Sequence, residues 1–336
     1  MESIMPVTLT RNPNLAKSPK AILLENEVQK NFKEVYKTSW WTGLAPEVCP
    51  GFDRERQCLV SLPLLNLEIC TRQDVMDAFN NVWTITELLF QSLKTEETFV
   101  RPPYHGLRHP MMFYYGHPAV LYYNKMRLAG IFKEPINLYL EKVLETGVDE
   151  MSWDDMSKNE MAWPKVIEVH GYRKIVYEQI IQFIKTCPEL DLAPGQRNFL
   201  QGSPLWSLWM GMEHEKIHIE TSSVLIRELP IELVESPKYF APIHPSLNDQ
   251  SEIKNEWVKG NKAKVKVGKP QNEPSYGWDN EYGHREVEIK DFMYTKCQIT
   301  NRDFYDFVTS GAYVNDKYWA AEGRSEEHTS ELQSQR

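Results

Sequence analysis

One stretch of the chain, from Ser203 to Pro230, constrains the fold more than any other because it carries both the start and the stop of a long helix. Ser203 is a favoured N-cap residue, and Pro204 suits the first position of a helix. Pro230 cannot continue a helix because it has no backbone N–H and its ring collides with the preceding turn. The sequence between them therefore predicts one uninterrupted helix.

This predicted helix carries His214 and His218, four residues apart. At about 100° per residue, the spacing puts both imidazoles on one face, which is how a helix offers two nitrogen ligands to one metal ion. Glu220 lies roughly 200° around the helix from His218, so we expect it to pair with a ligand or with a neighbouring helix instead of binding metal. Histidine pairs of this spacing are common without a metal, so a metal site requires a further ligand.

His117 is the predicted third ligand. It lies in a nearly all-apolar stretch, residues 110–130, and Pro118 follows it, which would kink a helix there. The kink is either accommodated by packing alone or aims His117 at the axis of the fold. A buried imidazole without a partner is unfavourable, and a metal shared with His214 and His218 would supply that partner. Three histidines from two helices leave coordination positions open, as in a catalytic metal site.

Two further histidines, His105 and His109, precede this stretch on either side of Arg108. We expect them to cap the helix or to lie at the surface. The acidic, aromatic segment 147–164 is predicted to be a long loop, and such loops in compact domains are usually functional or disordered.

The composition excludes several classes of function. The chain has 336 residues and 41% hydrophobic content, enough for two domains with cores. Its net charge is −9 and it has no run of lysine and arginine, so neither nucleic acid nor an anionic membrane is an expected partner. No apolar run approaches the roughly 20 residues of a membrane span, and the first residues lack the apolar centre of a secretory signal. The five cysteines show no CxxC spacing, which favours reduced thiols in a cytoplasmic protein.

Apolar periodicity predicts a helical bundle over residues 46–235. Long helical patterns are separated by loops, and no strand pattern occurs before residue 255. A polar arm, residues 1–45, precedes the bundle and includes a short predicted helix over 25–36. The predicted helices of the bundle cover 73–95, 110–130, 134–146, 166–186 and 203–230.

A second domain of α+β character is predicted over residues 236–323. A proline-rich linker opens it, and alternating apolar and polar residues then indicate strands within 258–267 and near 285–289, followed by a short helix over 301–309. The pattern looks incomplete at Gly323. The residues after it, 324–336, resemble the translation of a sequencing adapter, so we exclude them from the fold.

Four blocks of this sequence resemble the ovothiol synthase family, also called 5-histidylcysteine sulfoxide synthase. The resemblance covers about residues 100–323, and the blocks occur in the same order as in the family. They are RHPMMFYYGHPAVLYYNK (108–125), GVDEMSWDDM (147–156), GMEHEKIHIETSSVLIRELP (211–230) and GWDNEYGHREVEIKDFMYTKCQITNRDFYDFV (277–308).

The resemblance implies an α+β protein: a DinB-like four-helix bundle followed by a domain similar to the formylglycine-generating enzyme. It also implies a non-haem Fe(II) held by His117, His214 and His218. The iron would activate O2 and join the sulfur of cysteine to the imidazole C5 of histidine, with one oxygen retained as the sulfoxide. Imidazole suits Fe(II), and three ligands leave three positions for thiolate, imidazole and O2, although ligand types alone do not distinguish iron from zinc.

One feature of the family has no counterpart here. A tyrosine of the family's second domain reaches the iron site, and the matching segment would lie beyond Gly323. We therefore expect this polypeptide to carry the iron ligands without a complete active site and to be inactive or poorly folded as it stands.

Three alternatives fit the same residues. An ergothioneine-type sulfoxide synthase would use a trimethylated histidine, in some members with a γ-glutamyl thiol bound by an arginine-rich stretch; the acidic VDEMSWDDM segment favours the free amine of cysteine instead. A DinB-type thiol transferase would use the bundle alone with a divalent metal, and the second domain argues against it. A metal-binding scaffold without turnover is the non-enzyme alternative.

Overall fold

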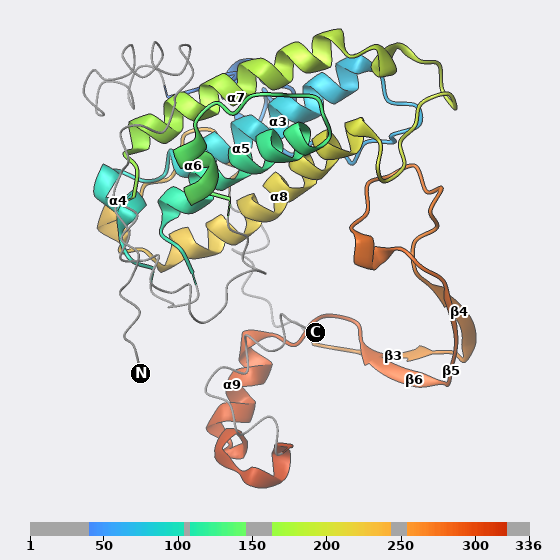
Figure 1. The fold of residues 1–336 in the computed structure, drawn as a ribbon. Coiled ribbons are helices and arrows are strands. Elements are labelled where there is room, and N and C mark those ends of the chain that lie inside the picture. The colour runs from blue at the N-terminus through green and yellow to red at the C-terminus, as the bar shows by residue number, and fades with distance from the viewer. Residues whose placement is uncertain (1–39, 104–107, 146–162, 243–253, 321–336) are drawn as a thin grey trace, which may run out of the picture. The chain divides into compact units, whose positions relative to one another are not determined.

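The computed structural model describes residues 40–103, 108–145, 163–242 and 254–320, and the chain divides into two compact units (Figure 1). Unit 1 comprises Met1–Ile243 with Lys269–Tyr282, and unit 2 comprises His244–Gly268 with Gly283–Arg336. The helix predicted over 25–36, most of the predicted loop 147–164 and the segment 324–336 lie outside the described residues.

Four long helices form the core of unit 1: α3 (Arg72–Phe90), α5 (Met111–Leu128), α7 (Val166–Thr186) and α8 (Pro204–Glu228). Both α3 and α5 contact both α7 and α8, so each long helix has two neighbours, as in a four-helix bundle. The predicted bundle is therefore present. The shorter helices of this part are α4 (Glu96–Val100), α6 (Leu138–Val143) and the 3-10 helices η1 (Pro46–Val48), η4 (Pro188–Asp191) and η5 (Ile231–Leu233).

Local sequence determines where these helices begin and end. At the start of α3, the Thr71 hydroxyl accepts a hydrogen bond from the Asp74 N–H (3.1 Å), and the Asp74 carboxylate accepts one from the Thr71 N–H (2.7 Å). Helix α8 lies within its predicted bounds, but the Ser203 side chain makes no capping hydrogen bond. The start of α8 relies instead on Pro204, whose fixed φ suits the first helical turn.

The secondary structure of unit 1 differs from the predictions at α6 and before α3. Helix α6 is shorter than the predicted 134–146 because the Asn137 side chain caps it, accepting hydrogen bonds from the N–H groups of Tyr139 and Leu140. The expectation of no strand before residue 255 is wrong, since β1 (Phe52–Asp53) pairs antiparallel with β2 (Cys58–Leu59). Strands of two residues are too short to show an alternating pattern.

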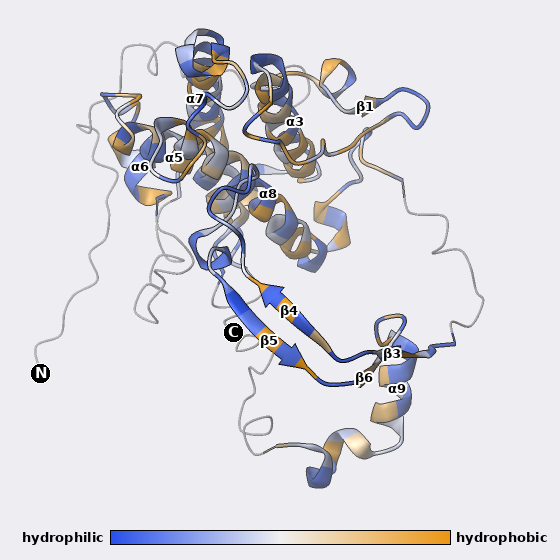
Figure 2. Ribbon diagram, turned by 90° about the vertical axis from the view of Figure 1, so that its right-hand side faces the viewer, coloured by the Kyte–Doolittle hydropathy of each residue, from blue (hydrophilic) through white to orange (hydrophobic). Residues whose placement is uncertain are grey.

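Helix α5 is buried on almost all sides, as its apolar sequence predicts, and it extends through Pro118. Hydrophobic residues recur along all four long helices in Figure 2. Helix α5 approaches α8 closely at Gly211, where an added Cβ would lie 2.0 Å from Cδ1 of the fully buried Tyr122 ring. A residue without a side chain is therefore required at this contact.

A segment distant in sequence, Lys269–Tyr282, also belongs to unit 1. The Tyr276 ring stacks on Trp206 of α8 with a centroid separation of 4.7 Å, and the Leu67 N–H donates to the Pro274 carbonyl at 2.6 Å. The segment includes the 3-10 helix η7 (Asp279–Glu281). Its contacts therefore lie with the bundle, although it comes from the middle of the range predicted for the second domain.

Unit 2 contains two antiparallel strand pairs and one helix, which are β3 (Trp257–Gly260) with β6 (Phe292–Thr295), β4 (Ala263–Val267) with β5 (Arg285–Ile289), and α9 (Asn301–Thr309). β5 and α9 lie where they were predicted, whereas β6 was not predicted. The 3-10 helices η8 (Ala312–Val314) and η9 (Asp316–Tyr318) follow α9. None of the described residues of unit 2 is buried, so this part of the unit has no closed core.

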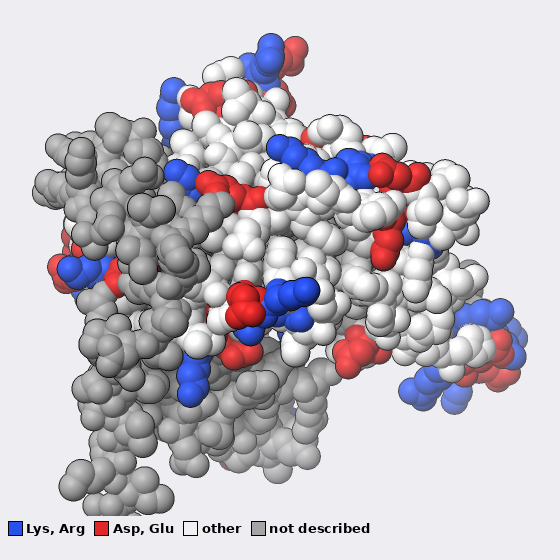
Figure 3. All heavy atoms as spheres, turned by 45° about the horizontal axis from the view of Figure 1, so that its top comes forward, with Lys and Arg blue, Asp and Glu red and all other residues white. Residues whose placement is uncertain are grey.

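The surface of the described residues carries charges of both signs. On the face shown in Figure 3, lysine and arginine side chains are interspersed with aspartate and glutamate. Within the described ranges, no helix combines the length and the apolar composition that crossing a bilayer requires.

Candidate metal centre

Three imidazoles meet inside the bundle. His117 comes from α5, and His214 and His218 come from α8. The Nε2 atom of His214 lies 3.2 Å from Nε2 of His117 and 3.0 Å from Nε2 of His218. One ligand nitrogen from each ring lies within 4.8 Å of the others. The structure thus brings together the three histidines that the sequence singled out.

The backbone orients the His117 ring. Its Nδ1 lies 2.6 Å from the carbonyl oxygen of Leu144, the residue that follows α6. A carbonyl only accepts, so Nδ1 carries the proton and the lone pair of Nε2 faces the other two histidines. Phe113, one turn earlier on α5, stacks on the same ring with a centroid separation of 4.7 Å. The His117 ring is therefore held in the tautomer and orientation of a metal ligand.

Burial keeps the three rings neutral. It lowers the pKa of His117 to about 4, and burial together with the neighbouring histidines lowers the pKa of His214 to about 2 and that of His218 to about 3. A metal binds the neutral imidazole, so these rings need to release no proton at neutral pH to become ligands.

The cluster fits a divalent transition metal such as iron. Three nitrogen donors converge from two helices, and imidazole suits Fe, Zn, Cu and Ni. The Nδ1 atoms of His214 and His218 are buried and make no hydrogen bond to another described residue. An ion bound at Nε2 would leave these Nδ1 atoms as they are, so the fit rests on the convergence of the three Nε2 atoms.

The pH dependence of stability tests this burial. In the metal-free folded chain, His218 binds its proton only near pH 3, whereas in the unfolded chain it binds one near the ordinary pKa of 6.5. Between about pH 6 and pH 4 the unfolded state therefore binds more protons, and the free energy of unfolding falls as the pH falls. Replacing His218 by leucine should flatten that dependence by about 1.4 kcal/mol per pH unit.

Urea unfolding in the presence of a chelator, at several pH values across this range, measures the effect. Burial is the largest cause of the lowered pKa of His117 and His214, and it acts in both proteins, so the difference between the two slopes reports His218. Equal slopes for the wild-type chain and the leucine variant would contradict a neutral, buried His218.

The other candidate residues do not join the cluster. His109, which was expected to cap the helix or to lie at the surface, is buried, and its ring lies 4.4 Å from that of Phe113, which separates it from His117. His105 lies outside the described residues. Glu220 is exposed and makes no ion pair with a described residue, so the expectation that it pairs with a ligand or a helix is wrong.

The sequence analysis missed a buried charge network beside the cluster. Glu87 on α3, Arg173 on α7 and Glu215 on α8 are each fully buried, and Arg173 faces both carboxylates at 3.6 Å. Burial raises the pKa of both Glu87 and Glu215, and the Arg173 guanidinium opposes that shift. In the sequence, the network is indicated locally by charged residues at helix positions where the periodicity places apolar side chains.

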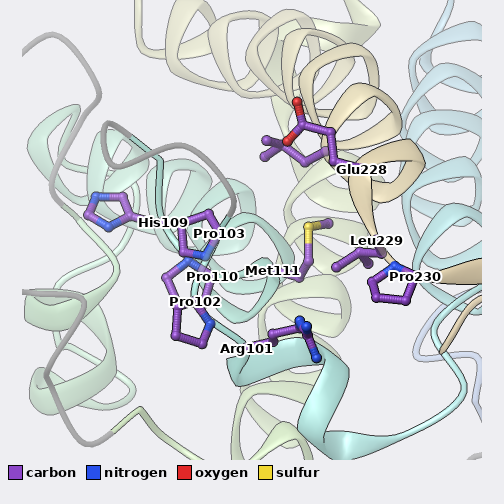
Figure 4. Close-up of a pocket in the computed structure, with 10 residues that line it drawn as sticks. Arg101, Pro102, Pro103, His109, Pro110, Met111, Glu228, Leu229 and Pro230 are labelled. Carbon is purple, nitrogen blue, oxygen red and sulfur yellow. The ribbon is translucent and has the colours of Figure 1, made fainter.

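A pocket of about 210 Å³ lies where α8 ends and α5 begins (Figure 4). Two of its lining residues lie on the helices that carry the histidines. Met111 precedes His117 by six residues and Leu225 follows His218 by seven, a separation of about 10 Å along the helix axis in each case. Its wall is mostly apolar. The lining residues are Arg101, Pro102, Pro103, His109, Pro110, Met111, Leu225, Glu228, Leu229 and Pro230.

Comparison with known proteins identifies the class of the bundle. Residues 78–222, which span α3 to α8, match the protein-family model of the DinB superfamily. The bundle is therefore a DinB-like domain, as the sequence resemblance implied. The match includes all three clustered histidines.

Two curated relatives carry the name ergothioneine biosynthesis protein 1. The protein from Neurospora crassa is 23% identical over 260 residues, which cover 69% of this chain and 27% of the relative. The protein from Schizosaccharomyces pombe is 23% identical over 297 residues, which cover 76% of this chain and 35% of the relative. The chain thus spans about a quarter to a third of the length of these relatives.

Proposed function

We propose that this protein is a non-haem Fe(II) sulfoxide synthase that uses O2 to join the sulfur of an amino-acid thiol to the imidazole ring of histidine. The observation that carries the proposal is the convergence of three neutral, buried imidazoles, His117, His214 and His218, inside a DinB-like bundle. The similarity to proteins named for ergothioneine biosynthesis supports this chemistry.

The roles of the residues follow from their positions. His117, His214 and His218 would hold the iron from one side and leave coordination positions free for the substrates. When bound, the iron would supply O2 activation and the positive charge that favours a deprotonated thiol. The Leu144 carbonyl keeps the proton of His117 on Nδ1, and the surrounding aromatic residues exclude water from the rings.

The reaction balances without a further reductant. The thiol loses its hydrogen, the imidazole carbon loses its hydrogen, and a carbon–sulfur bond forms between them. One oxygen atom of O2 stays on the sulfur as the sulfoxide, and the other leaves as water. The four electrons that O2 accepts all come from the two organic substrates.

The identity of the imidazole substrate has two candidates. The four sequence blocks that resemble ovothiol synthases favour cysteine and unmodified histidine, as in the first step of ovothiol biosynthesis. The names of the two curated relatives favour a trimethylated histidine, as in an ergothioneine-type enzyme. An assay that pairs each imidazole with cysteine and with γ-glutamylcysteine separates the two.

Two measurements test the proposal. We expect this chain to bind about one Fe(II) per molecule. We expect a longer form, of the length of the relatives, to convert one thiol and one imidazole substrate into a product whose mass equals their sum plus one oxygen atom minus two hydrogen atoms. A chain that binds no Fe(II), or a longer form that consumes O2 without this product, would contradict the proposal.

A further inference from the structure

The buried charge network connects all four long helices of the bundle. Glu87 lies on α3, Arg173 on α7 and Glu215 on α8, and all three side chains are fully buried. The Arg173 guanidinium also donates from Nη1 to the Tyr115 carbonyl of α5 at 3.0 Å, and it packs 4.1 Å from the Trp83 ring centroid of α3. Because no water competes for these groups, their relative placement is strongly constrained.

On α8, the residues of this network lie in the same helical turns as the histidines. The Tyr122 hydroxyl of α5 donates to Oε2 of Glu215 at 3.0 Å, while the Tyr122 ring packs against Gly211 one turn earlier on α8. Glu215 directly follows His214 and precedes His218 by three residues. Side chains on a helix point in fixed relative directions, so holding Glu215 toward α5 and α7 also fixes the directions of His214 and His218.

On α5, the network holds the helix on both sides of the third histidine. The Tyr115 carbonyl, two residues before His117, accepts from Arg173. Tyr122, five residues after His117, donates to Glu215. The rotation of α8 about its axis and its position along α5 are therefore set by contacts that flank the cluster without touching the clustered nitrogens.

We propose that Glu215 is a positioning residue, which through Arg173 and Tyr122 orients α8 so that His214 and His218 meet His117 around one metal ion. This inference rests on the proposed function, because it assumes that the three histidines bind metal. It adds that metal geometry depends on a carboxylate that does not itself reach the metal.

Cobalt(II) is the probe for the test, since its visible absorption reports the geometry of the ligands while chelator competition reports affinity. We expect Glu215→Gln, in the full chain, to weaken Co(II) binding about tenfold and to shift the absorption bands, which is the lower end of the loss measured when groups that orient metal ligands are removed. Tyr122→Phe, which keeps the ring against Gly211 and removes only the hydroxyl, should act in the same direction with a smaller change. If Glu215→Gln does not fold, the Co(II) affinity and spectrum of Tyr122→Phe test the inference instead.

Two control variants separate positioning from other effects. Glu213→Gln removes a carboxylate on the other side of His214 that pairs with Lys216 at 2.7 Å and is partly exposed, and it should change Co(II) affinity less than about twofold. Arg197→Met removes a buried cation that donates to the carbonyls of Leu67 and Cys70, neither of which lies on α8. This variant should have a lower free energy of unfolding and an unchanged Co(II) spectrum.

Several results would overturn the inference. Folded Glu215→Gln and Tyr122→Phe variants with wild-type affinity and spectrum would show that the network does not position the ligands. Equal losses in Arg197→Met would show that general destabilisation is the cause. A wild-type chain that binds no Co(II) would contradict the proposed function itself, and the inference with it.

Discussion

Replacing His117 by alanine should weaken the binding of Fe(II) or Co(II) by at least about 100-fold, because it removes one of the three proposed ligands and the one that comes from α5. The metal would then have only two histidine ligands, His214 and His218, which lie one turn apart on the same helix. Chelator competition with the purified chain measures the affinity, and metal analysis after gel filtration measures the stoichiometry.

His170 provides a matched control for this variant. It is also a buried histidine and its Nδ1 lies 2.7 Å from the Tyr115 hydroxyl, but it lies on α7 and is not part of the cluster. His170→Ala should lower the free energy of unfolding and leave the metal affinity within about threefold, since His170 offers no nitrogen to the cluster. If both variants lost metal equally, the effect would be one of folding and the three-histidine site would be refuted.

Much of the bundle was predictable because its signals are local. The proline at each end of α8, the apolar periodicity of α3 and α7, and the spacing of His214 and His218 each lie within one helix. These patterns give helix bounds to within a few residues and identify two residues on a common face. The third histidine was predicted by an energetic argument, that an imidazole in an apolar helix needs a partner.

The features that escaped prediction depend on contacts between distant segments. Glu215 pairs with Arg173 and, through it, with Glu87, and no spacing rule relates residues on three helices. His109 was expected to cap the helix or to lie at the surface, yet it is buried against the ring of Phe113. The packing of Lys269–Tyr282 with the bundle likewise depends on tertiary contacts, whereas the strand pair β1–β2 was missed because two-residue strands show no alternating pattern.

The network that escaped prediction should also be the most sensitive point of the fold. Arg173→Met is expected to lower the free energy of unfolding by about 3–5 kcal/mol, because it leaves two buried carboxylates, Glu87 and Glu215, without their counterion. Methionine fills a similar volume, so loss of packing contributes little to this change. Urea unfolding at constant pH measures it as a shift of the midpoint with an unchanged slope.

A triple variant distinguishes charge from packing in this result. Arg173→Met combined with Glu87→Gln and Glu215→Gln removes the two stranded charges along with their partner. Buried ion networks replaced as a whole lose far less stability than networks that lose one partner, so the triple variant should recover most of the loss. If it is instead no more stable than Arg173→Met alone, then the packing of Arg173 on Trp83 and Tyr115 stabilises the bundle, and the ion pairs do not.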